Sequence, residues 1–257
     1  MQWRILFKKE MIESWRNKKW VWVPLVIILL AIIDPISNYY MPQIIESVGG
    51  FPDGTVLEFP EFAPPEAVLM SLGQLSSLGI LVIVFMSMGT ISGERKSGVS
   101  ELILVKPVSH FNYITAKWTA LLVLVWVSLF LGMLVSWYYT NILFGDLSFT
   151  AFLLIVFFYG LWYMLVVTLV IFYNTLFKNA GMVAFFTILT IMIMSIITQI
   201  FGHVLEWSPN NLTDHILKML MTEDIPSQLV GSAGITIAIS AALLVFSVIR
   251  FKNKAVL

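Results

Sequence analysis

The residues from Gly93 to Ser109 are the part of the chain whose spacing comes closest to a site for chemistry. Gly93 and Gly98 have the separation of the two glycines in a phosphate-binding loop, but Val99 and Ser100 stand where that loop needs a lysine followed by serine or threonine. Without that lysine the segment has no group to hold the phosphates of ATP. We therefore expect that this chain has no nucleotide site of its own and is not an enzyme.

Metal binding and nucleophilic catalysis have equally little support in the sequence. The three histidines, His110, His203 and His215, lie far apart, and neither a zinc-protease motif nor a nucleophile elbow is present. The chain has no cysteine, which excludes a thiolate metal site, a cysteine nucleophile and a disulfide framework. We expect no metal site, no cofactor bound by this chain and no nucleic-acid partner.

The composition places most of the chain in lipid. Of the 257 residues, 59% are hydrophobic and 12% are charged, and the mean hydropathy is +0.90. Soluble domains contain about 25% charged residues, and a water-soluble fold of this size cannot bury so much apolar surface. The same composition excludes a disordered chain. A membrane protein is the class that remains.

Six stretches are long and apolar enough to cross about 30 Å of hydrocarbon as helices. They lack the strict alternation that a membrane barrel would need, so helices are favoured over strands. We predict an all-α membrane protein with residues 1–257 in a single permease domain. Its expected spans are 20–40, 71–93, 116–139, 150–177, 180–201 and 229–250.

The charged residues predict the orientation of these spans. Lysine and arginine accumulate in cytoplasmic segments, and 14 of the 15 lie before the first span, between spans two and three, between spans four and five, or after span six. Eleven of the 15 acidic residues lie on or near the opposite side. We therefore expect a multi-pass protein of a bacterial cytoplasmic membrane with both termini, including the tail 251–257, in the cytoplasm.

Three segments outside the spans have their own character. Residues 1–19 place Lys9, Glu13 and Arg16 on one helical face and aromatic side chains on the other, which favours an amphipathic helix in the cytoplasmic interface; a plain basic anchor is the alternative. The proline-rich segment 41–70 is expected to be an extracytoplasmic loop, either a connector or a small lid. A short outer helix is expected near 207–220, between spans five and six.

The connection between spans two and three is unusual for a membrane protein. Its charged residues, from Glu94 to Lys96, are followed by Gly98 and then by a short apolar run that stops at Lys106-Pro107. One or two helical turns with an apolar face and charged flanks are suited to docking into a groove of a soluble partner. The residues that we expect to carry this docking are Glu94, Arg95, Gly98, Glu101, Leu102 and Pro107.

This connection resembles the coupling segment in permeases of the type-2 ATP-binding-cassette (ABC-2) transporter family. The resemblance consists of the order Glu94-Arg95, Gly98, Glu101-Leu102, Pro107 and Lys117. Lys9, Glu10, Glu13 and Arg16 similarly resemble the family's interface helix, and 207–220 resembles its outer helical element. Asp34-Pro35 and Tyr39-Tyr40-Met41-Pro42 are similar to Gram-positive permeases encoded beside stress sigma-factor systems.

The resemblance implies a function and a set of partners. It implies a cytoplasmic coupling helix that receives movement from a separate ATPase subunit, in two copies that hold ATP and magnesium. A second permease copy, forming a homodimer, and membrane lipid would be the other partners. The complex would be an exporter in which this chain performs no bond chemistry.

Two other functions remain open from the sequence. One is a membrane regulator or immunity protein that binds a partner without transport, and the other is a secondary carrier. Ionisable residues inside the predicted spans are almost absent, apart from Asp34, and ion-coupled carriers need such groups at mid-depth. The scarcity disfavours a carrier and indicates a path suited to hydrophobic or amphipathic substrates.

One prediction follows from the docking hypothesis. Leu102→Asp is expected to abolish stimulation of the partner's ATPase activity, because it places a charge on the apolar docking face, while membrane insertion stays intact. ATP hydrolysis by the reconstituted complex measures the first effect, and membrane fractionation measures the second. Unchanged stimulation would refute the docking role.

Overall fold

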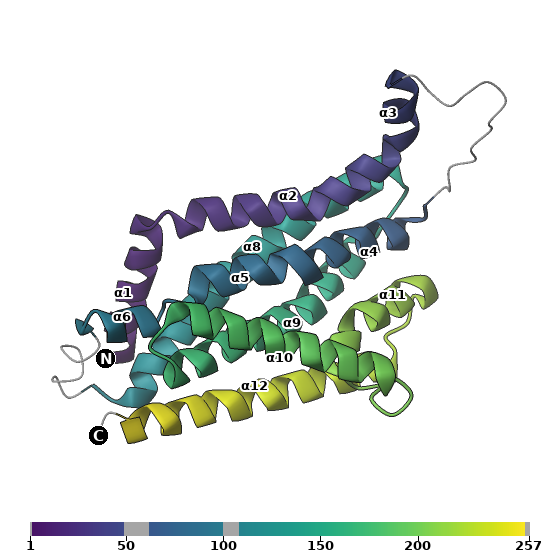
Figure 1. The fold of residues 1–257 in the computed structure, drawn as a ribbon. Coiled ribbons are helices and arrows are strands. Elements are labelled where there is room, and N and C mark those ends of the chain that lie inside the picture. The colour runs from purple at the N-terminus through teal and green to yellow at the C-terminus, as the bar shows by residue number, and fades with distance from the viewer. Residues whose placement is uncertain (1, 49–61, 100–107, 255–257) are drawn as a thin grey trace.

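The computed structural model describes residues 2–48, 62–99 and 108–254, and these residues form helices and turns without strands (Figure 1). Within them, six helical segments are long and apolar enough to span a membrane. This confirms the all-α class with six spans. The spanning helices are α2 (Lys19–Tyr39), the run α4 (Pro64–Gln74), η1 (Leu75–Gly79) and α5 (Ile80–Ser87), then α8 (His110–Leu143), α9 (Phe149–Leu176), α10 (Ala180–Ile200) and α12 (Ser227–Lys254).

Shorter helices mark the two ends of the bundle. At one end lie α1 (Gln2–Arg16), α6 (Ser92–Lys96) and both chain termini, and we call this the basic end (Figure 1). At the other lie α3 (Met41–Ser47), η2 (Pro209–Asn211) and α11 (Leu212–Thr222), and we call this the acidic end. The helix expected near 207–220 is thus present as η2 and α11.

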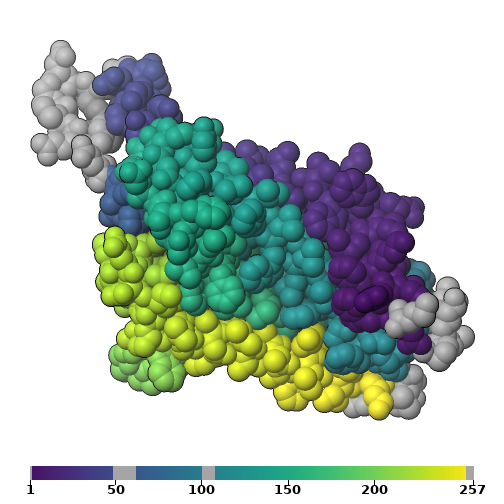
Figure 2. Space-filling model, turned by 180° about the vertical axis from the view of Figure 1, so that it is seen from behind, coloured from purple at the N-terminus to yellow at the C-terminus, as the bar shows by residue number. Residues whose placement is uncertain are grey.

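Helix α9 is the centre of the bundle. Of its most apolar window, 83% is buried, against 22% to 50% for the other five spans. Its side chains are apolar on every face, as a helix enclosed by other helices requires. Helix α12 packs along it with small polar side chains, Ser232, Thr236 and Ser240, buried at every fourth position, which permits close approach of the two backbones. Figure 2 shows α12 extending along the flank of the bundle.

The helices differ in length from the predicted spans. The second span begins at Pro64 rather than Ser71, because Pro64 and Pro65 occupy the first turn, where a missing backbone N–H costs no hydrogen bond. The segment 41–70 is therefore not a loop throughout, since 41–47 and 64–70 are helical and 49–61 lie outside the described residues. The third span covers 110–143 rather than 116–139, so its 34 residues extend well beyond a bilayer core.

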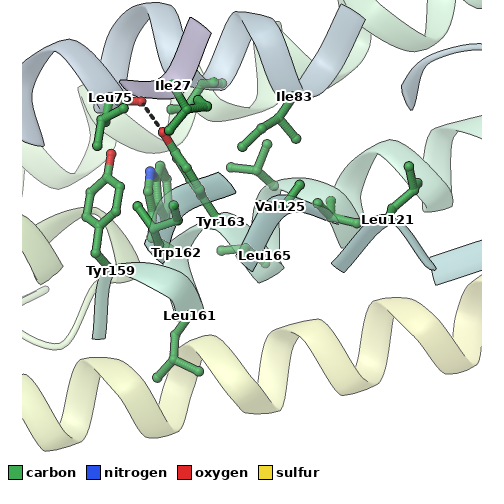
Figure 3. Packing of buried hydrophobic residues seen from close by; sticks show 14 of the residues in the cluster. Ile27, Leu75, Ile83, Leu121, Val125, Tyr159, Leu161, Trp162, Tyr163 and Leu165 are labelled. Carbon is green, nitrogen blue, oxygen red and sulfur yellow. Dashed lines mark hydrogen bonds between the residues drawn. The ribbon is translucent and has the colours of Figure 1, made fainter. Parts of the chain in front are cut away.

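A single π-helical turn, η1, interrupts the second span near its middle. Such a turn disturbs the regular backbone hydrogen bonds, and two buried tyrosines of α9 bind the groups around it. The Tyr163 hydroxyl donates to the Leu75 carbonyl at 2.9 Å (Figure 3), and the Tyr159 hydroxyl lies 2.9 Å from the Ser76 hydroxyl. The π turn is thus fixed to the central helix.

Gly79 is required at the end of this turn. A Cβ atom at Gly79 would lie 2.2 Å from the Tyr163 hydroxyl oxygen, whereas a Cβ at Gly73 would meet no atom within 4 Å. We expect Gly79→Ala to lower the free energy of unfolding by about 2 kcal/mol, because the hydroxyl must leave the Leu75 carbonyl. Thermal unfolding of the purified protein in detergent measures this effect. Gly73→Ala is the matched control, and equal stability of the two variants would contradict the assignment.

Candidate functional site

The candidate site is built around α6, which follows the second span after a turn at 88–91. Asn174, buried in the last turns of α9, accepts hydrogen bonds from the backbone N–H groups of Ile91 at 3.1 Å and Ser92 at 2.9 Å. Its amide nitrogen donates to the Ser87 carbonyl at 3.3 Å. These bonds satisfy N–H groups that a helix start leaves free. Helix α6 is therefore attached to the central helix by its first residues.

The other end of α6 is attached to α9 as well. The Arg95 guanidinium donates to the Thr175 carbonyl at 3.1 Å, one of the carbonyls left free at the end of α9. Gly98 then adopts φ 77°, in the left-handed region that glycine enters at little cost. The predicted docking residues Glu101, Leu102 and Pro107 lie outside the described residues.

Five charged residues from three helices meet beside α6, and we call them the charge cluster: Lys9, Glu10 and Glu13 of α1, Glu94 of α6 and Lys117 of α8. The Lys117 ammonium lies 2.8 Å from a Glu10 carboxylate oxygen and 2.9 Å from a Glu94 oxygen. The Lys9 ammonium lies 3.0 Å from both Glu10 and Glu13 and also pairs with Glu94. The cluster thus joins α1, α6 and α8 at the basic end.

The charge cluster is largely removed from solvent. The Lys117 side chain is 2% exposed, and those of Glu10 and Glu94 are 10% and 11% exposed. Tyr113 adds a hydroxyl donor to Glu94, and its ring centroid lies 5.1 Å from the Lys117 ammonium. Charges at this depth are tolerated only when they are paired and hydrogen-bonded. Burial of the Lys117, Glu10 and Glu94 charges is therefore tolerated only while all three are paired.

Lys9 shows how the pairing outweighs desolvation. Burial by itself would lower the pKa of the Lys9 ammonium, because it favours the neutral amine. The hydrogen bond to Glu94 and the attraction of Glu10 and Glu94 act in the opposite direction and prevail, so the pKa is raised above its ordinary value. Lys9 therefore keeps its positive charge throughout the physiological pH range.

The structure brings together residues that the sequence placed in two groups. Glu94, expected in the coupling segment, contacts Lys9 of the predicted interface helix and shares Lys117 with Glu10. Arg16 is exposed at the end of α1 and does not belong to the charge cluster. Lys117 belongs to the family-like motif but was not among the expected docking residues, although a lysine within the first turns of a long apolar helix is a signal that it needs an acidic partner.

The orientation of α1 could not be inferred from its amphipathic pattern. Its buried residue is Glu10, whereas the apolar side chains of Ile5, Ile12 and Trp15 are 64%, 50% and 68% exposed. The helix packs against α8 through ion pairs and leaves apolar side chains at its surface. That arrangement suits a helix whose outer face contacts lipid, since lipid tails accept such side chains.

The carboxylates of the charge cluster already have counter-charges within the chain. Oxygens of Glu10, Glu13 and Glu94 lie within 4.8 Å of one another, a separation that a metal ion could bridge. The ammonium groups of Lys9 and Lys117 lie among the same oxygens and neutralise them. The arrangement links three helices to one another through ion pairs.

Comparison with known proteins adds two findings. Residues 58–249 match the family described as ABC-2 family transporter protein. The chain is also 30% identical over 248 residues to the "Uncharacterized transmembrane protein YxlG" of Bacillus subtilis (strain 168), with 96% of each chain covered. The matched family region includes the α6 and α8 parts of the charge cluster.

Removal of the central cation tests the charge cluster. Lys117→Met keeps an unbranched side chain of nearly the same length but leaves Glu10 and Glu94 with Lys9 as their shared cation. We expect it to lower the free energy of unfolding by about 3 kcal/mol, measured by thermal unfolding in detergent. Glu13→Gln is the control, because the Glu13 side chain is 49% exposed and an exposed pair contributes about 0–1 kcal/mol. Similar losses in both variants would refute a special role for Lys117.

Proposed function

Because the chain belongs to the ABC-2 transporter family, we propose that it is the membrane permease of an ATP-driven exporter whose ATPase is a separate polypeptide. As a multi-pass membrane protein of this family it is a transport component. The family implies association with a cytoplasmic ABC ATPase. The absence of a phosphate-loop lysine after Gly98 supports placing ATP and magnesium on that partner.

In the proposed orientation the basic end faces the cytoplasm. The excess of lysine and arginine in the segments that α1, α6 and the C-terminal tail belong to supports this assignment. Both termini lie at this end of the bundle, as six crossings require (Figure 1). The acidic end, with α3 and α11, would then face the outside of the cell.

The proposed docking surface consists of α6, the segment that follows Gly98 and the neighbouring α1. The observation that carries this proposal is the double attachment of α6, to α9 through Asn174 and Arg95 and to α1 and α8 through the charge cluster. A partner that displaced α6 would have to move those helices with it. A loosely connected loop would instead absorb the displacement.

The proposed cycle follows from this attachment. Two ATPase copies bind beneath two permease copies, which associate as a homodimer. When ATP closes the ATPases, they tilt α6 and α1 on each permease and open a path between the spans toward the acidic end. The apolar lining expected of this path favours a hydrophobic or amphipathic substrate.

Co-purification tests the proposal directly. The full chain, expressed with a cytoplasmic ABC ATPase from the same genome, is expected to co-purify with two ATPase copies per permease dimer and to accelerate ATP hydrolysis. Co-purification without any effect on hydrolysis would favour the alternative function, a membrane regulator or immunity protein that binds a partner without transport. If no ATPase is retained, the proposal is wrong.

Substitution of two glycines tests whether the backbone conformation at Gly98 matters for docking. Gly98 has φ 77° and Gly93 lies in helical α6, and a Cβ atom added to either glycine would meet no atom within 4 Å. Gly98→Ala is therefore strained by its backbone alone, at a cost of about 1 kcal/mol, and redirects the chain that follows. We expect it to reduce stimulated ATP hydrolysis severalfold, and Gly93→Ala to leave it unchanged. Equal activity of both variants would remove Gly98 from the docking surface.

A further inference from the structure

Asp34 is an ionisable residue inside the first span, near the acidic end. Helix α2 continues without a break through Pro35 to Tyr39, so Asp34 lies about 8 Å along the helix from its last residue. Its side chain is partly buried, and one carboxylate oxygen accepts a hydrogen bond from the Gln74 side-chain amide of α4 at 2.8 Å. Ionisable side chains inside spanning helices are rare and commonly mark a binding site.

No cationic partner of Asp34 is found in the part of the chain that the structure describes. Among the described residues no lysine, arginine or histidine lies within ion-pair distance of it. The segments at the acidic end contain only Lys218, His203 and His215 as basic residues, and 49–61 contain none. A second copy of the chain would bring only the same few bases. Among the described residues Asp34 thus has the Gln74 amide but no cation as a partner, which leaves its negative charge available to a cationic ligand.

The amide that contacts Asp34 is held in a fixed position. Gln74 is the last residue before the π turn, and that turn is bound to α9 by the hydroxyls of Tyr159 and Tyr163. One turn earlier on α4, the buried Ser71 hydroxyl donates to the Ala31 carbonyl of α2 at 2.6 Å. The pair formed by Asp34 and Gln74 is thus preorganised by two other contacts in the same part of the bundle.

The surroundings of the pair are polar at the acidic end and apolar farther in. Beside Gln74, Gly73 and Ser77 are exposed on the second span, and toward the basic end they are followed by Leu78, 46% exposed, and Phe85, 54% exposed. On α2 the exposed side chains from Asp34 toward the basic end are Ile33, Leu29 and Leu25, each more than half exposed. One charged position is therefore followed by an apolar surface on both helices.

We infer that Asp34 and Gln74 bind the cationic group of an amphipathic substrate, whose apolar body lies along the exposed side chains of α2 and α5. The inference rests on the proposed transport function and narrows its substrate class to lipophilic cations. Asp34 supplies the charge, and Gln74 fixes the orientation of the carboxylate. Because Asp34 is partly buried, its attraction for a cation is stronger than that of a fully exposed carboxylate. The excess of acidic residues at this end of the protein would attract the same cations.

Binding can be measured without the ATPase, so that failure of this inference is distinguishable from failure of the docking proposal. The full chain is placed in phosphatidylcholine nanodiscs and titrated with three dansyl-labelled decyl probes. The probes end in trimethylammonium, hydroxyl or sulfonate. Fluorescence anisotropy, corrected for empty nanodiscs, gives the Kd of each. We expect the wild-type chain to bind the cationic probe about tenfold more tightly than the neutral probe, a difference of about 1.4 kcal/mol.

Three variants decide the outcome. Asp34→Asn keeps an oxygen that can accept the Gln74 hydrogen bond and is expected to abolish the preference for the cation. Asp34→Glu is expected to retain it, as is Asp146→Asn, which removes an exposed acid from the acidic end. Equal binding of the three probes by the wild-type chain, or a cation preference that survives Asp34→Asn, would overturn the inference. A loss of preference in Asp146→Asn as large as that in Asp34→Asn would overturn it too, since general attraction would then suffice.

Discussion

The burial of the Lys117 ammonium is the constraint on which the basic end of this protein depends. Lys117 lies on a long apolar helix, and its side chain has almost no exposed surface. Its charge therefore has to be compensated by residues of neighbouring helices. Glu10 and Glu94 provide that compensation from α1 and α6. The position of the N-terminal helix and that of the short helix after the second span are therefore determined together.

The need of buried polar groups for partners also accounts for other contacts of the central helix. Apolar side chains distinguish poorly between a neighbouring helix and lipid, so specific packing relies on small residues and on polar groups that need partners. Asn174 meets this need for the start of α6, and Tyr159 and Tyr163 meet it for the π turn. In each case the partner is on α9. The central helix thus owes its role to its hydrogen bonds as well as to its burial.

The two ends of the bundle differ in whether their buried charges are paired within the chain. At the basic end, cations and carboxylates are paired within the chain and link α1, α6 and α8. At the acidic end, Asp34 has a hydrogen-bond donor but no cation among the described residues. The proposed docking surface lies at the end whose charges are paired, and the proposed cation-binding pair lies at the end whose carboxylate has a hydrogen-bond donor but no cation.

The sequence alone determined the all-α membrane class and the six spans, and it identified the segment between spans two and three as a candidate docking segment. These features depend on hydropathy and local charge, which are readable from neighbouring residues. It placed Glu94, Lys9 and Glu10 among the candidate residues but did not connect them. Local rules also misplaced the start of the second span, since prolines that break a helix in its interior are accommodated in its first turn. Only the tertiary structure decided that Lys117 pairs with Glu10, 107 residues away, that α1 buries an acid rather than its aromatic side chains, and that a π turn follows the residue that contacts Asp34. Such pairings depend on which helices are neighbours. The need to pair buried charges selects those neighbours, and the residues involved are too far apart in the sequence for a local pattern to reveal them.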